Sequence, residues 1–267
     1  MLESFLVTFR ESLEAALIVG IVLAFLRQNK KQNFYSVVLL SLAAATVTSL
    51  FFAYLFSLVE GGFSGRNEQI FEGVTMILAT IFLSYMILWL YKEKNIGSIL
   101  RQKLQNQRSN VYGLFFLVFF AVLREGVETV FFLNAVKFNS GHVAFGAGFF
   151  GIFAALFLGY LFFIIEIKIP VKRFFQVSSF FLVLFAAGLF AHGIHELEEA
   201  GFLPILVEHL YNINTVFDEK STLGTFAKGV FGYNGNPSLS EVIGYAVYVI
   251  SAFILFYRKP RHVLSSS

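Results

Sequence analysis

The sequence predicts an all-α integral membrane protein of seven transmembrane helices, from its composition, the spacing of its apolar runs and the placement of its basic residues. Hydrophobic residues fill 57% of its 267 positions and charged residues 14%, whereas soluble domains are about 45–50% apolar and about 25% charged. A membrane-spanning helix needs about 20 mostly apolar residues, and runs of that length recur. We expect spans at about 2–26, 34–59, 69–91, 111–136, 142–167, 174–199 and 240–257.

The basic residues orient these spans. Most of the 20 lysines and arginines lie in the loops that follow the first, third, fifth and seventh spans. The opposite loops hold only Arg66, Lys137, Lys220 and Lys228. Because cytoplasmic loops are enriched in lysine and arginine, we expect the N-terminus outside, the C-terminus inside and an odd number of spans.

Little chain remains outside the spans. We expect one transmembrane permease domain over residues 1–258 and a short cytoplasmic tail at 259–267. The first span is expected to be a retained helix, because no basic stretch precedes it and charges interrupt it. The longest outer segment covers about 200–239, where apolar stretches at 202–217 and 223–231 predict short helices lying on the bilayer.

Two further patterns concern how the helices pack and start. One stripe of the fifth span holds only small residues, and it predicts close helix packing. These residues are Ala147, Gly151, Ala155 and Gly159. The pair Asn236-Pro237 is a helix-start signal just before the seventh span.

One charged motif, RExxE, occurs twice inside apolar segments. It reads RESLE at residues 10–14 in the first span and REGVE at 124–128 in the fourth. With three spans between their starts, the two helices run antiparallel. This predicts two inverted three-helix repeats, spans 1–3 and 4–6, plus a seventh helix, a plan in which transporters bind substrate near the bilayer midplane. Chance recurrence is the alternative, and the depth of both copies argues against it.

The spacing within the motif brings its charges together. On a helix the arginine and the two glutamates project within about one third of the circumference. If the two helices face each other, four glutamates converge and two arginines offset part of their charge. The predicted metal ligands are Glu11, Glu14, Glu125 and Glu128, with Arg10 and Arg124 as supporting charge. The alternative is a pair of structural ion pairs that lock helix packing.

The ligand chemistry of such a site favours hard cations. Carboxylate oxygens suit Mg²⁺, Mn²⁺ and ferric iron. Cysteine is absent and methionine occurs three times, which excludes disulfides and sites for soft metals such as Cu(I).

A second polar cluster ends the sixth span. His192, His195, Glu196 and Glu199 fall at i, i+3, i+4 and i+7 on one helical stripe, and Glu198 points away from it. By the predicted orientation this stripe lies near the outer face, so we expect it to receive arriving metal. Glu72 and Glu241 begin the third and seventh spans and are further candidates, although Glu241 also fits a first-turn acid favoured by the helix dipole. The alternative is a polar helix end solvated by interfacial water.

These residues resemble the oxidase-linked high-affinity iron permease family, which includes the fungal iron permease and the bacterial ferrous iron permease of the elemental iron uptake system. That family carries R-E-x-x-E in the first and fourth of seven helices. The resemblance extends to Glu72-Gly73, to HGIHELEEAG ending the sixth span and to FGYNGNPSLSEVIGY before the seventh, and reaches about residue 257.

The resemblance implies iron uptake through the cytoplasmic membrane. Iron, as Fe²⁺ or Fe³⁺, would be the transported substrate, with no permanently bound cofactor. An extracytoplasmic iron oxidase or peroxidase and an iron-binding protein are the implied partners.

We therefore expect an iron permease and not an enzyme. An importer of manganese, zinc or lead is an alternative, because carboxylates alone do not choose among these ions. A membrane oxidoreductase is a second alternative, but the spans hold no paired histidines for haem and no cysteines for clusters. The basic inner loop is expected to lie on anionic lipid and not to bind nucleic acid. The sequence is compatible with a monomer and with an oligomer.

Overall fold

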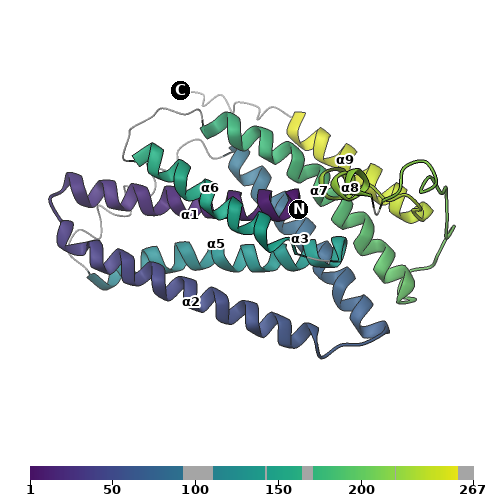
Figure 1. Cartoon of the computed structure of the whole chain (residues 1–267), viewed down its shortest axis with the longest axis horizontal. Helices are drawn as coiled ribbons and strands as arrows, with labels where there is room; N and C mark the ends of the chain where they lie inside the picture. The colour runs from purple at the N-terminus through teal and green to yellow at the C-terminus, as the bar shows by residue number, and fades with distance from the viewer. Residues whose placement is uncertain (93–110, 142, 164–170, 220, 258–267) are drawn as a thin grey trace, which may run out of the picture. The chain divides into compact units, whose positions relative to one another are not determined.

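The computed structural model describes residues 1–92, 111–141, 143–163, 171–219 and 221–257, and these residues form helices and no strand (Figure 1). Seven long helices occur in this part of the chain: α1 (Leu2–Gln28), α2 (Tyr35–Glu60), α3 (Arg66–Lys92), α5 (Val111–Ser140), α6 (Phe145–Phe163), α7 (Val171–Glu199) and α9 (Leu239–Tyr257). The short helices η1 (Gln32–Phe34) and α8 (Thr222–Phe231) precede α2 and α9. The predicted helical fold class is confirmed, whereas the expected tail at 259–267 and most of the basic inner loop lie outside the described residues.

Several helices have the length and hydropathy of membrane spans. The segments Gln32–Glu60, Arg66–Leu88 and Ser179–Glu199 are long and apolar enough to cross a bilayer, and Phe145–Leu161 and Leu239–Leu255 are shorter apolar helices. Helices α1 and α5, with 27 and 30 residues, are also long enough to cross a bilayer. Their hydropathy is lowered by the charged RExxE motifs. The chain is a multi-pass protein of the cell membrane.

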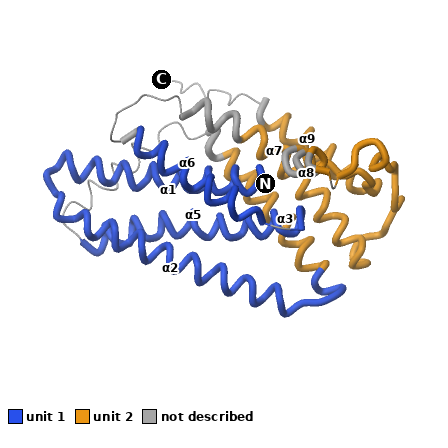
Figure 2. Tube along the Cα trace, viewed as in Figure 1, with its two compact units in different colours: residues 1–68, 93–178 blue, residues 69–92, 179–267 orange. Residues whose placement is uncertain are grey.

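The chain divides into two compact units (Figure 2). Unit 1 comprises residues 1–68 and 93–178, and unit 2 comprises 69–92 and 179–267. Unit 1 therefore holds α1, α2, α5 and α6, whereas unit 2 holds most of α3 and α7 together with α8 and α9. Neither unit is a continuous piece of sequence.

In unit 1, α6 packs along α1, and the small residues of α6 make the close approach possible (Figure 1). A Cβ on Gly151 would overlap Thr8 Oγ1 and lie 2.7 Å from the Phe5 carbonyl oxygen. Thr8 Oγ1 also donates to the Gly148 carbonyl at 2.9 Å, and Ala155 is fully buried. The predicted role of the small-residue stripe in helix packing is confirmed.

The second close pair in unit 1 is α2 with α5 (Figure 1). Ser41 and Ala45 are fully buried on α2. One turn further along, Ser49 lies against Gly126, where a Cβ would overlap Ser49 Oγ. Helix α1 also packs against α5, and this third contact brings the two RExxE motifs into one region.

In unit 2, α3 and α7 approach each other through two glycines. A Cβ on Gly73 would lie 2.9 Å from the Gly193 carbonyl oxygen, and a Cβ on Gly193 would lie 3.0 Å from that of Gly73. Further along the same pair, Thr80 Oγ1 donates to the Ala186 carbonyl at 3.2 Å. Helix α9 joins through a 2.7 Å hydrogen bond between Ser84 and Tyr248.

The outer segment differs in part from the prediction. Its second apolar stretch forms α8, capped by Ser221, whose hydroxyl accepts from the Gly224 amide at 3.0 Å. Residues 202–217 form turns and bends, so the helix expected there was wrong. Proline lacks an amide hydrogen, and asparagine side chains compete for backbone groups. Pro204 stands in this stretch, and the Asn214 side chain accepts from the Glu219 amide at 3.2 Å.

Candidate metal sites

The antiparallel helices α1 and α5 bring acidic residues of both motifs together. Carboxylate oxygens of Glu11, Glu14 and Glu125 all lie within 4.8 Å of one another. The side chains of Arg10 and Glu11 are 0% and 1% exposed. Three of the four predicted ligands therefore form a buried cluster, here called the inner site, and one cation could contact all three.

Each arginine pairs with both glutamates of its own motif. Arg10 Nη1 lies 3.4 Å from Glu11 Oε1, and Arg10 Nη2 lies 3.2 Å from Glu14 Oε1. Arg124 Nε lies 4.0 Å from Glu125 Oε1 and 2.7 Å from Glu128 Oε1. The fourth predicted ligand is thus held by Arg124 beside the cluster of three.

The ion pairs leave part of the inner site unsatisfied. Glu11 Oε2, Glu14 Oε1 and Glu125 Oε2 are buried and have no hydrogen-bond partner among the described residues. Burying a carboxylate costs free energy unless its oxygens are paired. Four carboxylates and two guanidinium groups carry a formal charge of −2. Ion pairing accounts for Glu14 Oε1 but not for Glu11 Oε2 and Glu125 Oε2, and a bound cation would satisfy those two oxygens.

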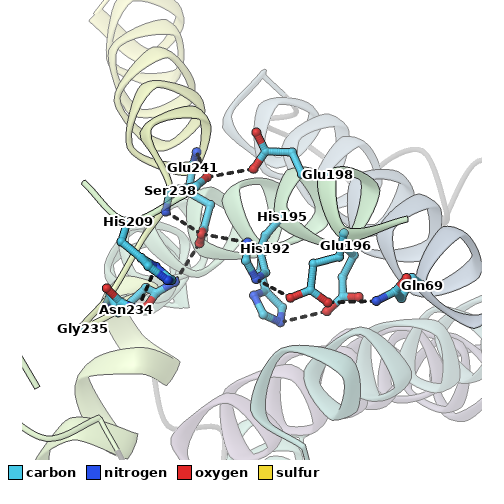
Figure 3. A network of polar contacts seen from close by, with 12 residues as sticks. Gln69, His192, His195, Glu196, Glu198, His209, Asn234, Gly235, Ser238 and Glu241 are labelled. Atoms are coloured by element: carbon cyan, nitrogen blue, oxygen red, sulfur yellow. Dashed lines mark hydrogen bonds and ion pairs between the residues drawn. The ribbon is translucent and has the colours of Figure 1, made fainter. Parts of the chain in front are cut away.

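The second predicted cluster lies at the end of α7 (Figure 3). His192 Nε2 is 3.6 Å from Glu196 Oε1. Both ring nitrogens of His195 face carboxylates, with Nε2 3.1 Å from Glu199 Oε1 and Nδ1 3.2 Å from Glu241 Oε1. His195 therefore lies between two acids, and its buried Nδ1 makes no hydrogen bond among the described residues.

Glu241 is part of the cap of α9. Its Oε1 accepts from the Ser238 amide at 2.9 Å, and the Ser238 hydroxyl accepts from the Glu241 amide at 3.2 Å. This reciprocal arrangement is a capping box. Asn234 Nδ2 donates to the other carboxylate oxygen at 2.8 Å. The helix start signalled by Asn236-Pro237 is confirmed, and the Glu241 carboxylate is 3% exposed with both oxygens bonded.

A cavity of about 520 Å³ lies beside these residues in unit 2. His192, His195 and Glu199 line it, whereas Glu196 and the half-buried Glu72 are not among its lining residues. The cavity is also lined by ionisable residues that the sequence reasoning missed, among them Glu198 and His209. Glu198 was set aside because it falls off the helical stripe, and His209 lies in a segment without helical periodicity.

One more buried acid was not predicted. Glu3, near the start of α1, is 3% exposed. Ser140 at the end of α5 donates to its two oxygens at 3.1 and 2.9 Å. In the sequence, Glu3 is an ordinary acidic residue in the first turn of a helix. Only the contact between α1 and α5 shows that its side chain is buried and hydrogen-bonded.

Comparison with known proteins gives a consistent result. The family model described as the iron permease FTR1 family matches residues 1–267. The ferrous iron permease EfeU of Yersinia pestis is 32% identical over 273 residues, covering 100% of this chain and 97% of the relative. The EfeU proteins of Escherichia coli O157:H7 and Shigella sonnei (strain Ss046) are each 33% identical over 268 residues, covering 98% of this chain and 97% of the relative. No solved structure matches.

Proposed function

We propose a route for iron through this chain, which belongs to the iron permease FTR1 family and takes up iron as its transported substrate. The route passes through the inner site, with Glu11, Glu14 and Glu125 as ligands. The observation that carries the proposal is the convergence of three carboxylates within 4.8 Å, with buried oxygens of Glu11 and Glu125 that have no hydrogen-bond partner among the described residues. Glu128 is the fourth ligand. It gives up its ion pair with Arg124 when it binds the metal.

The route rests on two inverted repeats, α1 to α3 and α5 to α7, with α9 added at the end. In these repeats α1 corresponds to α5, α2 to α6 and α3 to α7. The α1–α6 pair therefore corresponds to the α5–α2 pair, and both pairs pack closely. The mutual approach of Gly73 on α3 and Gly193 on α7 also supports this symmetry, as does the identical pairing of Arg10 and Arg124 within their motifs. The N-terminus lies outside and the C-terminus inside.

In this topology the end of α7 faces the outside. Iron arrives at a receiving site there, for which the candidates are His192, His195, Glu196, Glu199 and Glu72. It then moves to the inner site at mid-depth, and rocking of one repeat against the other opens that site to the cytoplasm. Any change of iron valence belongs to an extracytoplasmic oxidase or peroxidase, with an iron-binding protein delivering the ion. All steps within this chain take place in one permease domain, residues 1–258.

Charge balance at the inner site favours a divalent ion. The four glutamates and two arginines sum to −2, so Fe²⁺ would neutralise the site and Fe³⁺ would leave an excess of +1 in a low-dielectric region, where net charge is costly. Manganese and zinc carry the same charge. Selectivity for iron therefore has to be measured directly.

Radiolabelled iron uptake tests the proposal in cells that lack their own importers. Glu14→Gln and Glu128→Gln keep side-chain shape and remove one charge each, and Glu68→Gln, an exposed position at the start of α3, is the matched control. We expect the first two variants to lose uptake, the control to keep it, and excess manganese or zinc to compete poorly. Normal uptake by Glu14→Gln and Glu128→Gln at equal membrane levels would refute the route, because the motifs would then be packing ion pairs.

A further inference from the structure

The contact between α1 and α5 is polar at one end and apolar at the other. On α1, residues 15–26 follow the motif and carry no polar side chain, and the same is true of residues 113–123 before the motif on α5. The other halves of the two helices contain Glu3, Ser4, Asn139 and Ser140. Because the helices are antiparallel, the polar halves lie together on one side of the inner site and the apolar halves on the other.

We propose that this contact is the path of the transported cation through unit 1. The ion enters at the polar end, past the carboxylate of Glu3, and reaches the inner site. The apolar end is the gate that closes the inner site toward the cytoplasm. The direction of passage rests on the route and the topology proposed above, whereas the difference between the two ends does not.

The repeated motif allows the two ends to be compared residue by residue. Residue 10 corresponds to residue 124, so each residue of α1 corresponds to the one 114 positions later on α5. The pairs that are polar at one end and apolar at the other are Glu3 with Leu117, Ser4 with Val118, Asn139 with Phe25 and Ser140 with Leu26. Each of these polar positions is therefore aliphatic or aromatic in the other repeat.

Solvation at the membrane surface does not explain the polar end. Glu3 and Leu117 each precede the arginine of their motif by seven residues, which is about 10 Å along a helix. Interfacial water would favour a polar residue equally at both positions. The polar residues are also shielded from solvent, since Glu3, Ser4 and Asn139 are 3%, 0% and 4% exposed.

Two polar groups at this end have no partner. Ser4 Oγ and Asn139 Nδ2 are buried and make no hydrogen bond among the described residues. Ser4 precedes Glu11 by two helical turns, so both side chains lie on one face of α1. Buried polar groups are normally paired. Water that enters with a cation would pair these two groups on the way to the inner site.

Glu3 supplies the charge at the polar end. Ser140 Oγ donates to its two oxygens at 3.1 and 2.9 Å, which holds the carboxylate between α1 and α5. Lys137, one turn earlier on α5, is engaged by Glu60 at 2.5 Å. A carboxylate at the mouth of a narrow polar passage attracts cations and repels anions. Glu3 therefore selects for the sign of the charge before the ion meets the inner site.

The apolar end is closed by a packed layer. Residues of α1 and α5 form one buried cluster there with two residues of α2, and none is more than 8% exposed. The members from α1 and α5 are Val22, Leu26, Leu114, Val118 and Val122. A hydrophobic constriction excludes water and ions. The inner site therefore opens toward this end only when α1 and α5 separate.

Cysteine accessibility tests the path, because the chain has no cysteine of its own. Ser4→Cys and Val118→Cys are a matched pair, since both residues are 0% exposed and correspond to each other in the two repeats. A cationic methanethiosulfonate reagent should modify Ser4→Cys on intact cells about tenfold or more faster than it modifies Val118→Cys on inverted membrane vesicles. After denaturation in detergent, both cysteines should react fully.

The same cysteine reports the charge of Glu3. In the Ser4→Cys chain, Glu3→Gln keeps an oxygen that accepts from Ser140 but removes the charge. It should slow the cationic reagent by about tenfold and should not slow an anionic reagent of similar size. Without the cysteine, Glu3→Gln should raise the iron concentration for half-maximal uptake by about tenfold. Glu68→Gln, the exposed control, should change neither property.

The outcomes separate this path from the route proposed above. No reaction at Ser4→Cys from either side, or equal slowing of both reagents by Glu3→Gln, would overturn the path. Equal reaction at the two cysteines would overturn the gate. Reaction at Ser4→Cys only in inverted vesicles would overturn the outer entrance together with the proposed orientation. These rates do not depend on iron binding by Glu14 and Glu128, so the path and the inner site can fail separately.

Discussion

The contact between Gly126 and Ser49 allows a sharp test of how the second motif is held. Gly126 lies between Glu125 and Glu128 on α5, and a Cβ at this position would overlap Ser49 Oγ and lie 2.8 Å from Ser49 Cβ. The nearest atoms belong to a short side chain bonded to its own helix, since Ser49 Oγ donates to the Ala45 carbonyl at 2.9 Å. Gly126→Ala therefore has to push α2 and α5 apart.

Overpacking of this kind costs about 1–3 kcal/mol. A loss of 1 kcal/mol lowers the melting temperature by roughly 2–4 °C in proteins of about this size, so we expect Gly126→Ala to melt about 2–12 °C lower in detergent. Iron uptake should fall as well, because the shift displaces the carboxylates on either side of residue 126.

Second substitutions at Ser49 should restore the stability lost in Gly126→Ala in two steps. Ser49→Ala in the Gly126→Ala chain removes the overlapping oxygen but keeps the Cβ at 2.8 Å, so it should restore only part of the stability. Ser49→Gly removes both atoms and should restore most of it. Equal melting temperatures for Gly126→Ala and the wild type, or the absence of rescue by Ser49→Gly, would show that α2 and α5 do not approach as described.

Three further predictions concern other parts of the chain. Ser140→Ala removes the hydrogen bonds to buried Glu3 and should cost about 1.5–3 kcal/mol of unfolding free energy, whereas Ser140→Thr should cost less. Ser238→Ala removes the cap of α9 and the bond to Glu198 and should cost about 1 kcal/mol or more, with Ser238→Thr retaining most of the stability. The chain has no cysteine, so single cysteines can report its topology. On intact cells a membrane-impermeant maleimide should label Ser64→Cys, between α2 and α3, and should not label Gln28→Cys at the end of α1. The opposite result would invert the proposed topology.

The sequence predicted the helices and the local part of the inner site because both depend on short-range spacing. Each long helix follows an apolar run, and the i, i+4 spacing places Arg10 beside Glu14 and Arg124 beside Glu128, as the structure shows. The meeting of the two motifs was a further step, since it required α1 and α5 to be neighbours. That step came from the repeated motif and the expected topology, not from periodicity.

The cavity could not be predicted in the same way. His209 reaches it from a stretch with turns and bends, and Glu198 is directed by a bond to Ser238, 40 residues further along the chain. Helical spacing carries no information about such contacts. It also assigned His195 to the same role as His192, and it gave no sign that His195 lies between Glu199 and Glu241.

The division of the chain between the two units has a consequence for biosynthesis. Unit 1 begins with α1 and α2 but is completed by α5 and α6, whereas α3, made before those two, belongs to unit 2 and packs on α7. Membrane helices leave the ribosome in chain order, so neither unit is complete when the first 92 residues have been made. A product that ended there would carry the charges of α1 without those of α5, and α3 without α7. We therefore expect the N-terminal half to have no stable fold of its own and to be degraded unless the second half is supplied.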